Sequence, residues 1–245
     1  MRLDVFLAEH GFAASRTEAR RLIEEGAVLV DGIPVTKPAF TVDGREENIL
    51  LNRAAKSYVS RGGLKLDGAL CAFDLVTEGR LCLDVGASSG GFTDCLLRHG
   101  AARVIAADVG SGQLAPVLRA DPRVSLLEHF NARYMEPGDF PYVPDLAVMD
   151  VSFISATLLL EPLYRVLADR ADFICLVKPQ FEVGRGAVGK GGIVRDESAR
   201  REALNHVCTR AQATGFTVMG AIPSPIRGGD GNIEYLVHFR KGDVG

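Results

Sequence analysis

The feature that most constrains this 245-residue chain is a regular alternation of apolar strands and helices that begins near residue 80. Strands that alternate with helices build a mainly parallel sheet covered on both faces, which predicts an α/β fold. A loop with Gly228, Gly229 and Gly231, and no helix, joins the last two strands, so the final strand is expected to run antiparallel. The expected strands are 81–85, 103–108, 124–127, 145–150, 171–177, 217–222 and 234–239, and the expected helices are 63–73, 92–99, 112–119, 155–167 and 197–214.

Residues 1–57 form a second, smaller unit with a different pattern. One helix is expected to begin near Leu3, where apolar residues recur at helical spacing, and to end at Gly11. A second helix is expected to follow the capping box Ser15–Glu18 and to end at Gly26. Short strands are expected over residues 28–30, 33–35 and 48–51, the first two joined by an Asp31–Gly32 turn. The sequence thus predicts a small α+β domain ahead of the α/β domain.

Composition narrows the possible functions. Lys and Arg total 28 against 31 Asp and Glu, a net charge of −3, so a nucleic-acid role needs local basic patches. The five cysteines form no C-x-x-C pair and the five histidines show no metal-ligand spacing, which favours free thiols in a reducing cytoplasm. The sequence shows no export signal and no apolar window of about 18–20 residues, the length that spans a bilayer. We therefore expect a cytoplasmic protein with no metal and no membrane segment.

A turn rich in small residues follows the first strand of the α/β domain and carries the best cofactor signal. Segment 81–93 has the order strand, turn, helix, which lets a ligand approach the backbone. Asp84 lies two residues before Gly86, and Asp108 ends the next strand, where a carboxylate can accept hydrogen bonds from ribose hydroxyls. The turn lacks the second glycine of a dinucleotide fingerprint, and Asp84 would repel a pyrophosphate but suit the ammonium of S-adenosylmethionine. The alternative is a turn with a purely structural role.

A second glycine run, Gly184–Lys190, has the spacing of a phosphate-binding P-loop. The next residue is Gly191, where that motif needs a Ser or Thr for magnesium, and no helix is expected to begin there. We therefore expect a mobile loop at the rim of the site, without ATP binding.

Charged residues are expected to gather at the carboxyl edge of the sheet, where open α/β sheets place their sites. Asp150 and Lys178 each follow an apolar strand. Glu234 opens the antiparallel last strand and so belongs to the same edge, and Lys65 lies on the helix before the first strand. Each residue alone could be an ordinary salt-bridge partner, but their convergence from separate strands favours a functional site.

Arginines of the small unit form a candidate RNA surface. Arg16 and Arg20 lie four residues apart on one helix face, with Arg21 beside them. Charge alone favours a solvated helix face. The order of two helices and a strand–turn–strand, with VLVDGIPV at residues 28–35, resembles the S4 RNA-binding domain and favours contact with RNA.

Five motifs that span nearly the whole chain resemble the TlyA, or haemolysin-A, family. They are YVSRGGLKL at 58–66, DVGASSGGFTD at 84–94, DVSFIS at 150–155, LVKPQFE at 176–182 and GNIEY at 231–235. Members of this family join an S4 domain to an FtsJ-like methyltransferase domain. The resemblance implies a Rossmann-like methyltransferase sheet of seven strands, mainly parallel with the last strand antiparallel, after a small α+β S4 domain. We expect the S4 domain over 1–57, a linker and the helix with Lys65 over 58–80, and the FtsJ-like domain over 81–245.

The resemblance also implies a function and the residues that serve it. The family's Lys-Asp-Lys-Glu catalytic tetrad falls on Lys65, Asp150, Lys178 and Glu234. The cofactor S-adenosylmethionine would be bound by Asp84, Gly86, Ala87, Ser88, Gly90, Gly91, Phe92 and Asp108. RNA would be contacted by Arg2, Arg16, Arg20, Arg21, Ser60 and Arg61. The implied reaction is methyl transfer to a ribose 2′-hydroxyl, usually of cytidine, in ribosomal RNA or ribosomal subunits.

Other functions stay open at this point. Amino-group methyltransferases typically carry a [DNS]-P-P-[YF] run, which residues 150–153 lack. Carbon-5 cytosine enzymes need a nucleophilic cysteine, whereas Cys175 lies in an apolar strand and is expected in the core. A non-catalytic RNA-binding or ribosome-assembly factor would need no tetrad, and the haemolysin name suggests a cytolysin. Lys178 could remove the hydroxyl proton or orient the oxygen.

Overall fold

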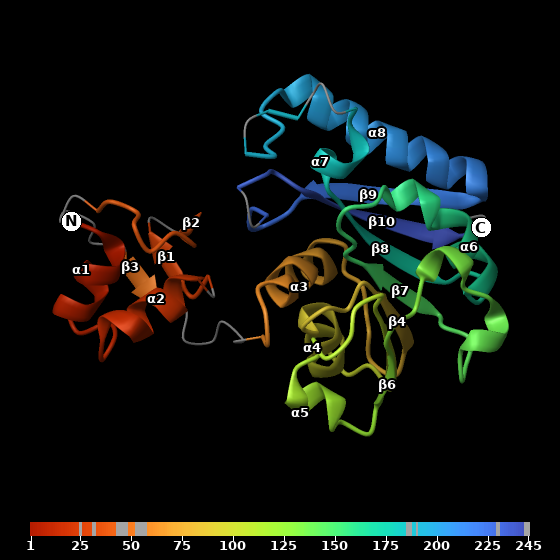
Figure 1. Cartoon of the computed structure of the whole chain (residues 1–245), viewed down its shortest axis with the longest axis horizontal. Coiled ribbons are helices and arrows are strands. Elements are labelled where there is room, and N and C mark those ends of the chain that lie inside the picture. The colour runs from red at the N-terminus through yellow and green to blue at the C-terminus, as the bar shows by residue number, and fades with distance from the viewer. Residues whose placement is uncertain are drawn as a thin grey trace.

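The computed structural model describes residues 1–24, 26–30, 33–42, 49–51, 58–184, 188–189, 191–228 and 231–242. Outside these ranges lie the expected Asp31–Gly32 turn, the start of the expected strand at Asn48, the last residues 52–57 of the expected S4 domain, Gly229 and the centre of the second glycine run. Figure 1 shows a small N-terminal unit, in red and orange, and a larger α/β unit built from the rest of the described chain.

A seven-stranded sheet forms the centre of the larger unit, in the order β6-β5-β4-β7-β8-β10-β9. Its strands are β4 (Leu81–Val85), β5 (Arg103–Ala107), β6 (Val124–Leu127), β7 (Leu146–Met149), β8 (Asp172–Val177), β9 (Phe216–Pro223) and β10 (Tyr235–Lys241). Strands β4 to β8 pair in parallel, and β10 pairs antiparallel with both β8 and β9. The predicted α/β sheet with an antiparallel final strand is therefore confirmed.

Helices cover both faces of this sheet (Figure 1). The α-helices are α3 (Gly62–Ala72), α4 (Gly91–Arg98), α5 (Pro116–Arg119), α6 (Leu160–Val166), α7 (Pro179–Glu182) and α8 (Glu197–Thr214). Three short 3-10 helices connect them: η1 (Ala132–Tyr134), η2 (Pro137–Asp139) and η3 (Ala156–Leu158).

Three helical segments differ from the prediction. The helix expected over 112–119 is reduced to α5, because Gly112 has a φ of +68° and Pro116 takes the first helical position. The helix expected over 155–167 is divided into η3 and α6. Helix α7 forms where no helix was expected, since Pro179 lacks an N–H and suits the first helical position directly after Lys178.

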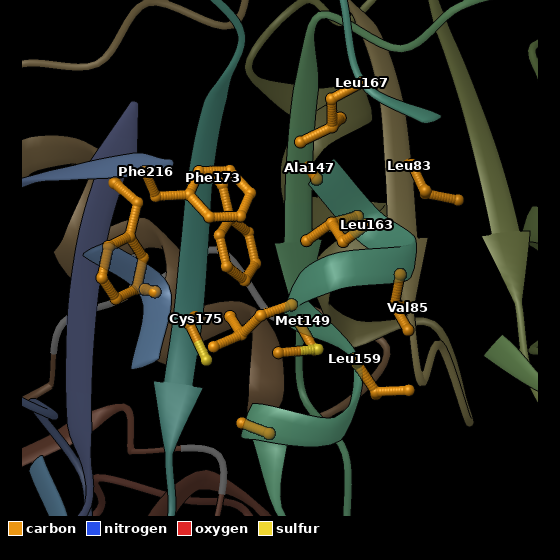
Figure 2. Packing of buried hydrophobic residues seen from close by; sticks show 14 of the residues in the cluster. Leu83, Val85, Ala147, Met149, Leu159, Leu163, Leu167, Phe173, Cys175 and Phe216 are labelled. Atoms are coloured by element: carbon orange, nitrogen blue, oxygen red, sulfur yellow. The ribbon is translucent and has the colours of Figure 1, made fainter. Parts of the chain in front are cut away.

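Alternate residues of the central strands face opposite sides of the sheet and build two cores. Leu83 and Phe173 belong to the core that α6 and α8 cover, which Figure 2 shows from close by. Their neighbours Cys82 and Ile174 belong to the core that α3 and α4 cover. Cys175 is fully buried in the first core, as expected, and burial raises the pKa of its thiol. A buried thiol with a raised pKa does not provide a nucleophile for carbon-5 methylation.

The N-terminal unit has its own core and its own sheet. It contains α1 (Leu3–Glu9), α2 (Arg16–Glu24), β1 (Val28–Val30), β2 (Ile33–Pro34) and β3 (Ile49–Leu51), with the sheet order β2-β1-β3. The N–H of Glu18 donates to Ser15 Oγ at 3.2 Å, as the capping box predicts. The Glu18 carboxylate accepts from the N–H of Ala14, one residue before the position that the motif indicates.

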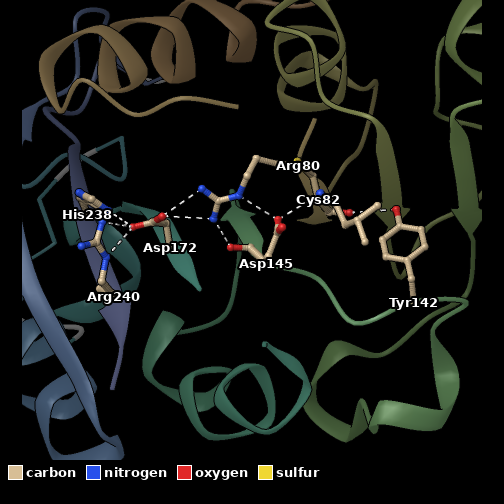
Figure 3. A network of polar contacts seen from close by, with 8 residues as sticks. Arg80, Cys82, Tyr142, Asp145, Asp172, His238 and Arg240 are labelled. Atoms are coloured by element: carbon tan, nitrogen blue, oxygen red, sulfur yellow. Dashed lines mark hydrogen bonds and ion pairs between the residues drawn. The ribbon is translucent and has the colours of Figure 1, made fainter. Parts of the chain in front are cut away.

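A network of charges around the buried Asp172 joins the strands at the sheet edge opposite their carboxyl ends (Figure 3). Asp172 at the start of β8 accepts hydrogen bonds from Arg80 and Arg240, at 3.2 and 3.0 Å, and lies 2.9 Å from His238 Nε2. Arg80 also donates to Asp145 Oδ1 at 2.9 Å, just before β7. Burial alone would raise the pKa of Asp172, but the bonds from His238, Arg240 and Arg80 outweigh it and lower that pKa to about 2.

We predict that Asp172→Ala lowers the free energy of unfolding at pH 7 by about 3–5 kcal/mol, because it removes the buried carboxylate that Arg80, His238 and Arg240 share. The pKa of Asp172 is lower in the folded protein than in the unfolded chain, where it is about 3.9. Its contribution is therefore fully present at neutral pH and lost as the pH falls from about 4 toward 2. Chemical denaturation across this pH range measures the effect, with Asp169→Ala as control because that side chain is 100% exposed. Equal stabilities of wild type and Asp172→Ala at pH 7 would contradict the prediction.

Candidate active site

Four charged side chains meet at the carboxyl edge of the sheet as two lysine–carboxylate pairs. Lys178 Nζ lies 2.6 Å from Asp150 Oδ1, and Lys65 Nζ donates to Glu234 Oε2 at 2.6 Å. β7 and β8 are parallel neighbours, so the residues that follow them lie side by side. Helix α3 brings Lys65 to the start of β10, where Glu234 lies. The structure thus brings together all four residues that the sequence analysis placed at this edge.

Polar neighbours fix the two pairs. Lys178 Nζ donates a hydrogen bond to Ser152 Oγ at 2.8 Å. Gln180 Nε2 donates to Glu234 Oε1 at 3.4 Å. A Cβ atom at Gly228 would lie 2.4 Å from Glu234 Oε1, so only glycine lets the loop before β10 pass this close to the carboxylate.

Backbone N–H groups bind the side chain of Asp108 beside the turn that follows β4. Gly86 has a φ of +84°, and a Cβ there would lie 2.5 Å from the carbonyl oxygen of Asp150, so both conformation and space require glycine. The N–H groups of Ser88 and Gly110 donate to the two carboxylate oxygens of Asp108 at 2.8 and 2.7 Å. Each oxygen keeps a further lone pair for a ligand hydroxyl.

Asp84 lies beneath this turn. Its side chain is inaccessible to solvent, Oδ2 accepts from the Thr93 hydroxyl at 2.7 Å, and Oδ1 is buried without a hydrogen-bond partner. Burial raises the pKa of Asp84 to about 7, although the hydrogen bond from Thr93 acts in the opposite direction. A cation placed above the turn would favour the ionised form of this carboxyl.

Two adjacent cavities open at this edge. The first, of about 270 Å³, contains Lys65, Asp150 and Lys178 in its wall, together with five of the expected cofactor residues: Gly86, Ala87, Ser88, Gly91 and Phe92. The second, of about 530 Å³, is lined by Asp108 and by Gly86, Ser88, Asp150 and Ser152, which it shares with the first. Its size suits a small organic ligand. Asp84 and Gly90 line neither cavity.

Backbone conformation and packing account for glycine at position 90. It precedes α4 with a φ of +94°, and a Cβ there would lie 2.3 Å from the side chain of Leu118.

The four expected RNA-contacting arginines of the N-terminal unit fall into two groups. Arg2 and Arg16 bind the buried carboxylate of Asp4 at 2.9 and 3.0 Å, and these bonds lower the pKa of Asp4 to about 2 despite its burial. The bond from Arg16 therefore also holds α2 against α1, whereas Arg2 and Asp4 both lie at the start of α1. Arg20 and Arg21 are exposed on α2.

Ser60 and Arg61 connect the two units. With Arg21 they line a third cavity, of about 350 Å³, between α2 and the start of α3. Both also line the first cavity, which contains Lys178. The two cavities thus form a path from α2 to the lysine–carboxylate pairs, with Arg21 and Arg61 in its walls.

Sequence reasoning missed several residues of this edge. Phe153 is 92% exposed with a φ of +64°, a conformation that is unfavourable for a bulky side chain. Its ring lies 5.3 Å from that of Phe181. Arg227 lines the first cavity, and Ser152 lines both. Ser152, Phe153 and Phe181 lie inside the motifs 150–155 and 176–182. Their closeness in sequence to Asp150 and Lys178 could have identified them as candidate site residues.

A group of potential metal ligands lies between α3 and α4, which the spacing of the histidines in the sequence does not indicate. Asp67, Cys95 and His99 each place one potential ligand atom within 4.8 Å of the others. Asp67 Oδ1 accepts from Tyr58 Oη at 2.9 Å and lies 2.6 Å from His99 Nε2. These contacts tie the segment before α3 to α4, which accounts for the group as a structural link.

Family models match both units of the chain. A model of the FtsJ-like methyltransferase matches residues 58–241, and a model of the S4 domain matches residues 1–48.

Curated relatives match along nearly the full length. The 16S/23S rRNA (cytidine-2′-O)-methyltransferase TlyA of Mycobacterium tuberculosis H37Rv is 47% identical over 98% of this chain and 89% of that protein. Hemolysin A of Brachyspira hyodysenteriae is 44% identical over 98% of this chain and 99% of that protein.

Solved structures show the same architecture. A protein from Streptococcus thermophilus, described as a candidate hemolysin, is 44% identical with a TM-score of 0.76, covering 99% of this chain and 89% of that one. N-methyltransferase NodS of Bradyrhizobium japonicum, in complex with S-adenosyl-L-homocysteine, shares the fold at 16% identity and a TM-score of 0.52, covering 73% of this chain and 86% of that one. Together with the family models and the curated relatives, these matches show that the chain belongs to the FtsJ-like methyltransferase family and carries an S4 domain at its N-terminus.

Proposed function

We propose that this protein transfers a methyl group from S-adenosylmethionine to a ribose 2′-hydroxyl, of cytidine, in ribosomal RNA. The observation that carries the proposal is the pair of lysine–carboxylate contacts at the mouth of a cleft next to the Gly86 turn. A non-catalytic RNA-binding protein would have no use for four charges held at the edge of such a cleft.

The residues of the cleft fit S-adenosylmethionine, which supplies a methyl group on a positively charged sulfur. The carboxylate of Asp108 stands at the end of β5 with lone pairs free for ribose hydroxyls, and its position is fixed by two backbone N–H groups. The unpartnered Oδ1 of Asp84 lies under the turn, and the ammonium of the cofactor, unlike a phosphate, would favour the ionised form of this carboxyl. We place the amino-acid end near Gly86 and the adenosine in the cavity of about 530 Å³.

The chemistry needs an oxygen aligned with the methyl–sulfur bond. The 2′-oxygen forms the new C–O bond while the C–S bond breaks and its electron pair returns to sulfur. The hydroxyl proton is released, so the positive charge of the sulfonium leaves as a proton. The protein contributes alignment and charge, and Lys178, which lines the cavity of about 270 Å³, would contact the hydroxyl.

RNA binding is assigned to the N-terminal unit and the path beside it. The exposed Arg20 and Arg21 would contact phosphates, and Ser60 and Arg61 would continue that contact toward the tetrad. The exposed ring of Phe153 offers a stacking surface for a base beside the reacting ribose.

Ribosomal RNA is the proposed substrate because relatives of this length are named for it. Labelled methyl transfer to isolated ribosomal subunits and to naked ribosomal RNAs tests the proposal, and label on neither substrate would refute it. The free thiols of all five cysteines agree with the reducing cytoplasm in which such RNA occurs.

The name of the Brachyspira relative makes membrane lysis the second candidate. Within the described part of the chain, no helix has both the length and the apolar character that crossing a membrane requires. Erythrocyte lysis by the purified protein is the direct test of this alternative.

We predict that Asp108→Ala weakens S-adenosylmethionine binding about 10- to 100-fold, since hydrogen bonds to a charged group contribute about 1.5–3 kcal/mol. Isothermal titration calorimetry measures the affinity. Asp169→Ala, which removes a fully exposed carboxylate, should bind like the wild type. Unchanged affinity of Asp108→Ala would remove this residue from the cofactor site.

We predict that the double variant Arg20→Ala/Arg21→Ala binds RNA more weakly and with a smaller salt dependence. Each lost phosphate contact should reduce the slope of log K against log salt by about 0.7–0.9. Arg16 is left intact because it also binds Asp4. The control is Arg201→Ala/Arg210→Ala on the exposed part of α8, and equal slopes for the two double variants would return Arg20 and Arg21 to an ordinary solvated surface.

We predict that Lys178→Ala keeps a normal thermal melt and binds cofactor and RNA, but methylates at least about 100-fold more slowly. Lys178→Arg should also be slow, because a guanidinium holds its donors in a different plane. Single-turnover methylation at saturating cofactor and RNA measures the effect. A Lys178→Ala protein with a near-normal rate would show that Lys178 serves the structure and not the reaction.

A further inference from the structure

Ser152 occupies the junction of three cavities at the active edge. It lines the cavity of about 270 Å³ with Lys65, Asp150 and Lys178, and the cavity of about 530 Å³ with Asp108. It also lines a cavity of about 400 Å³ on the far side of Lys178, next to Phe153 and Phe181. The side chain of Ser152 therefore borders all three cavities, including the one proposed for the adenosine and the one that contains Lys65 and Asp150.

The contact of Ser152 with Lys178 determines where the amine points. A lysine Nζ has three N–H donors when protonated, and two N–H donors and a lone pair when neutral. Asp150 Oδ1 lies 2.6 Å from Nζ, and Ser152 Oγ accepts from Nζ at 2.8 Å. The Ser152 hydroxyl thereby fixes one N–H direction of Nζ, while the Asp150 contact lies outside hydrogen-bond geometry. A further direction of Nζ, with its hydrogen or its lone pair, is left for the substrate oxygen.

The rest of the loop shows that Ser152 is not needed to build it. Ser155 holds the loop, because its Oγ donates to Glu182 Oε2 at 2.6 Å and accepts from the N–H of Thr157 at 3.2 Å. The N–H of Ala156 donates to Glu182 Oε1 at 2.7 Å. Ser152 is exposed, and its hydroxyl accepts a hydrogen bond from Lys178.

We propose that Ser152 is a positioning residue of the methyl-transfer reaction. It orients the Lys178 amine toward the ribose 2′-oxygen, at the place where the cavities of about 270 Å³ and about 530 Å³ meet. The inference rests on the proposed function. Ser152 acts through Lys178, and it adds a fifth group to the four charged residues at this edge.

Single-turnover methylation at saturating cofactor and RNA tests this role. Ser152→Ala should be about 10- to 100-fold slower, the effect of losing one hydrogen bond to a charged group, while the affinities for cofactor and RNA and the melting temperature stay unchanged. Ser152→Thr keeps the hydroxyl at an exposed position and should recover most of the rate. A Ser152→Ala rate equal to wild type, or a Ser152→Thr protein as slow as Ser152→Ala, would overturn the proposal.

A measurement without turnover separates this inference from the proposed function. In protein with isotope-labelled lysine, the NMR signal of the Lys178 side chain should shift and report greater mobility in Ser152→Ala but not in Ser152→Thr. An unchanged Lys178 signal in Ser152→Ala would overturn the positioning role even if methylation were confirmed. A wild-type protein that methylates no RNA would instead refute the proposed function. The NMR signal would still report the contact between Ser152 and Lys178 in that case.

Discussion

The parallel pairing of β7 with β8 is the constraint on which the active edge depends. Residues Leu146–Met149 align with Asp172–Cys175, so the chain leaves both strands at the same edge of the sheet. Asp150 and Lys178 are then neighbours although 28 positions separate them in the sequence. The antiparallel direction of β10 is the second condition, because it brings the start of that strand, and Glu234 before it, to the same edge. A helical crossover in place of the final loop would have sent Glu234 to the opposite end of the sheet.

The two ends of the sheet satisfy their charges differently. At the edge opposite the site, Asp172 is bound by Arg80, His238 and Arg240, and the network is closed (Figure 3). At the carboxyl edge, Asp84 Oδ1 and Gln180 Oε1 are buried without hydrogen-bond partners. Asp150 Oδ1 makes its close contact with Lys178 outside hydrogen-bond geometry. One edge thus stabilises the fold, and the other keeps polar atoms available for a ligand. Buried polar atoms without partners lower the free energy of unfolding, and the packed core offsets this loss.

Much of this arrangement could be predicted from the sequence because it depends on local pattern. Strand and helix periodicity fixes which residues end the strands, and the rule that parallel strands share an edge then gathers Asp150, Lys178 and Glu234. What could not be predicted depends on contacts between distant segments. Nothing near Arg16 in its helix announces that it binds Asp4 of α1, and the position of Asp84 beneath the turn follows from tertiary burial. The unexpected proximity of Asp67 to Cys95 and His99 likewise follows from the packing of α3 on α4.

The central claim is that this edge acts on a ribose oxygen and not on a base. Its most direct test is to treat ribosomal RNA with the protein and labelled S-adenosylmethionine, digest the product with alkali, and identify the labelled fragment by mass spectrometry. The account predicts an alkali-resistant dinucleotide that carries the methyl group on the 2′-oxygen of its first ribose, because a methylated 2′-oxygen cannot attack the neighbouring phosphate. A label found only in alkali-sensitive mononucleotides, with the methyl group on the base, would contradict it.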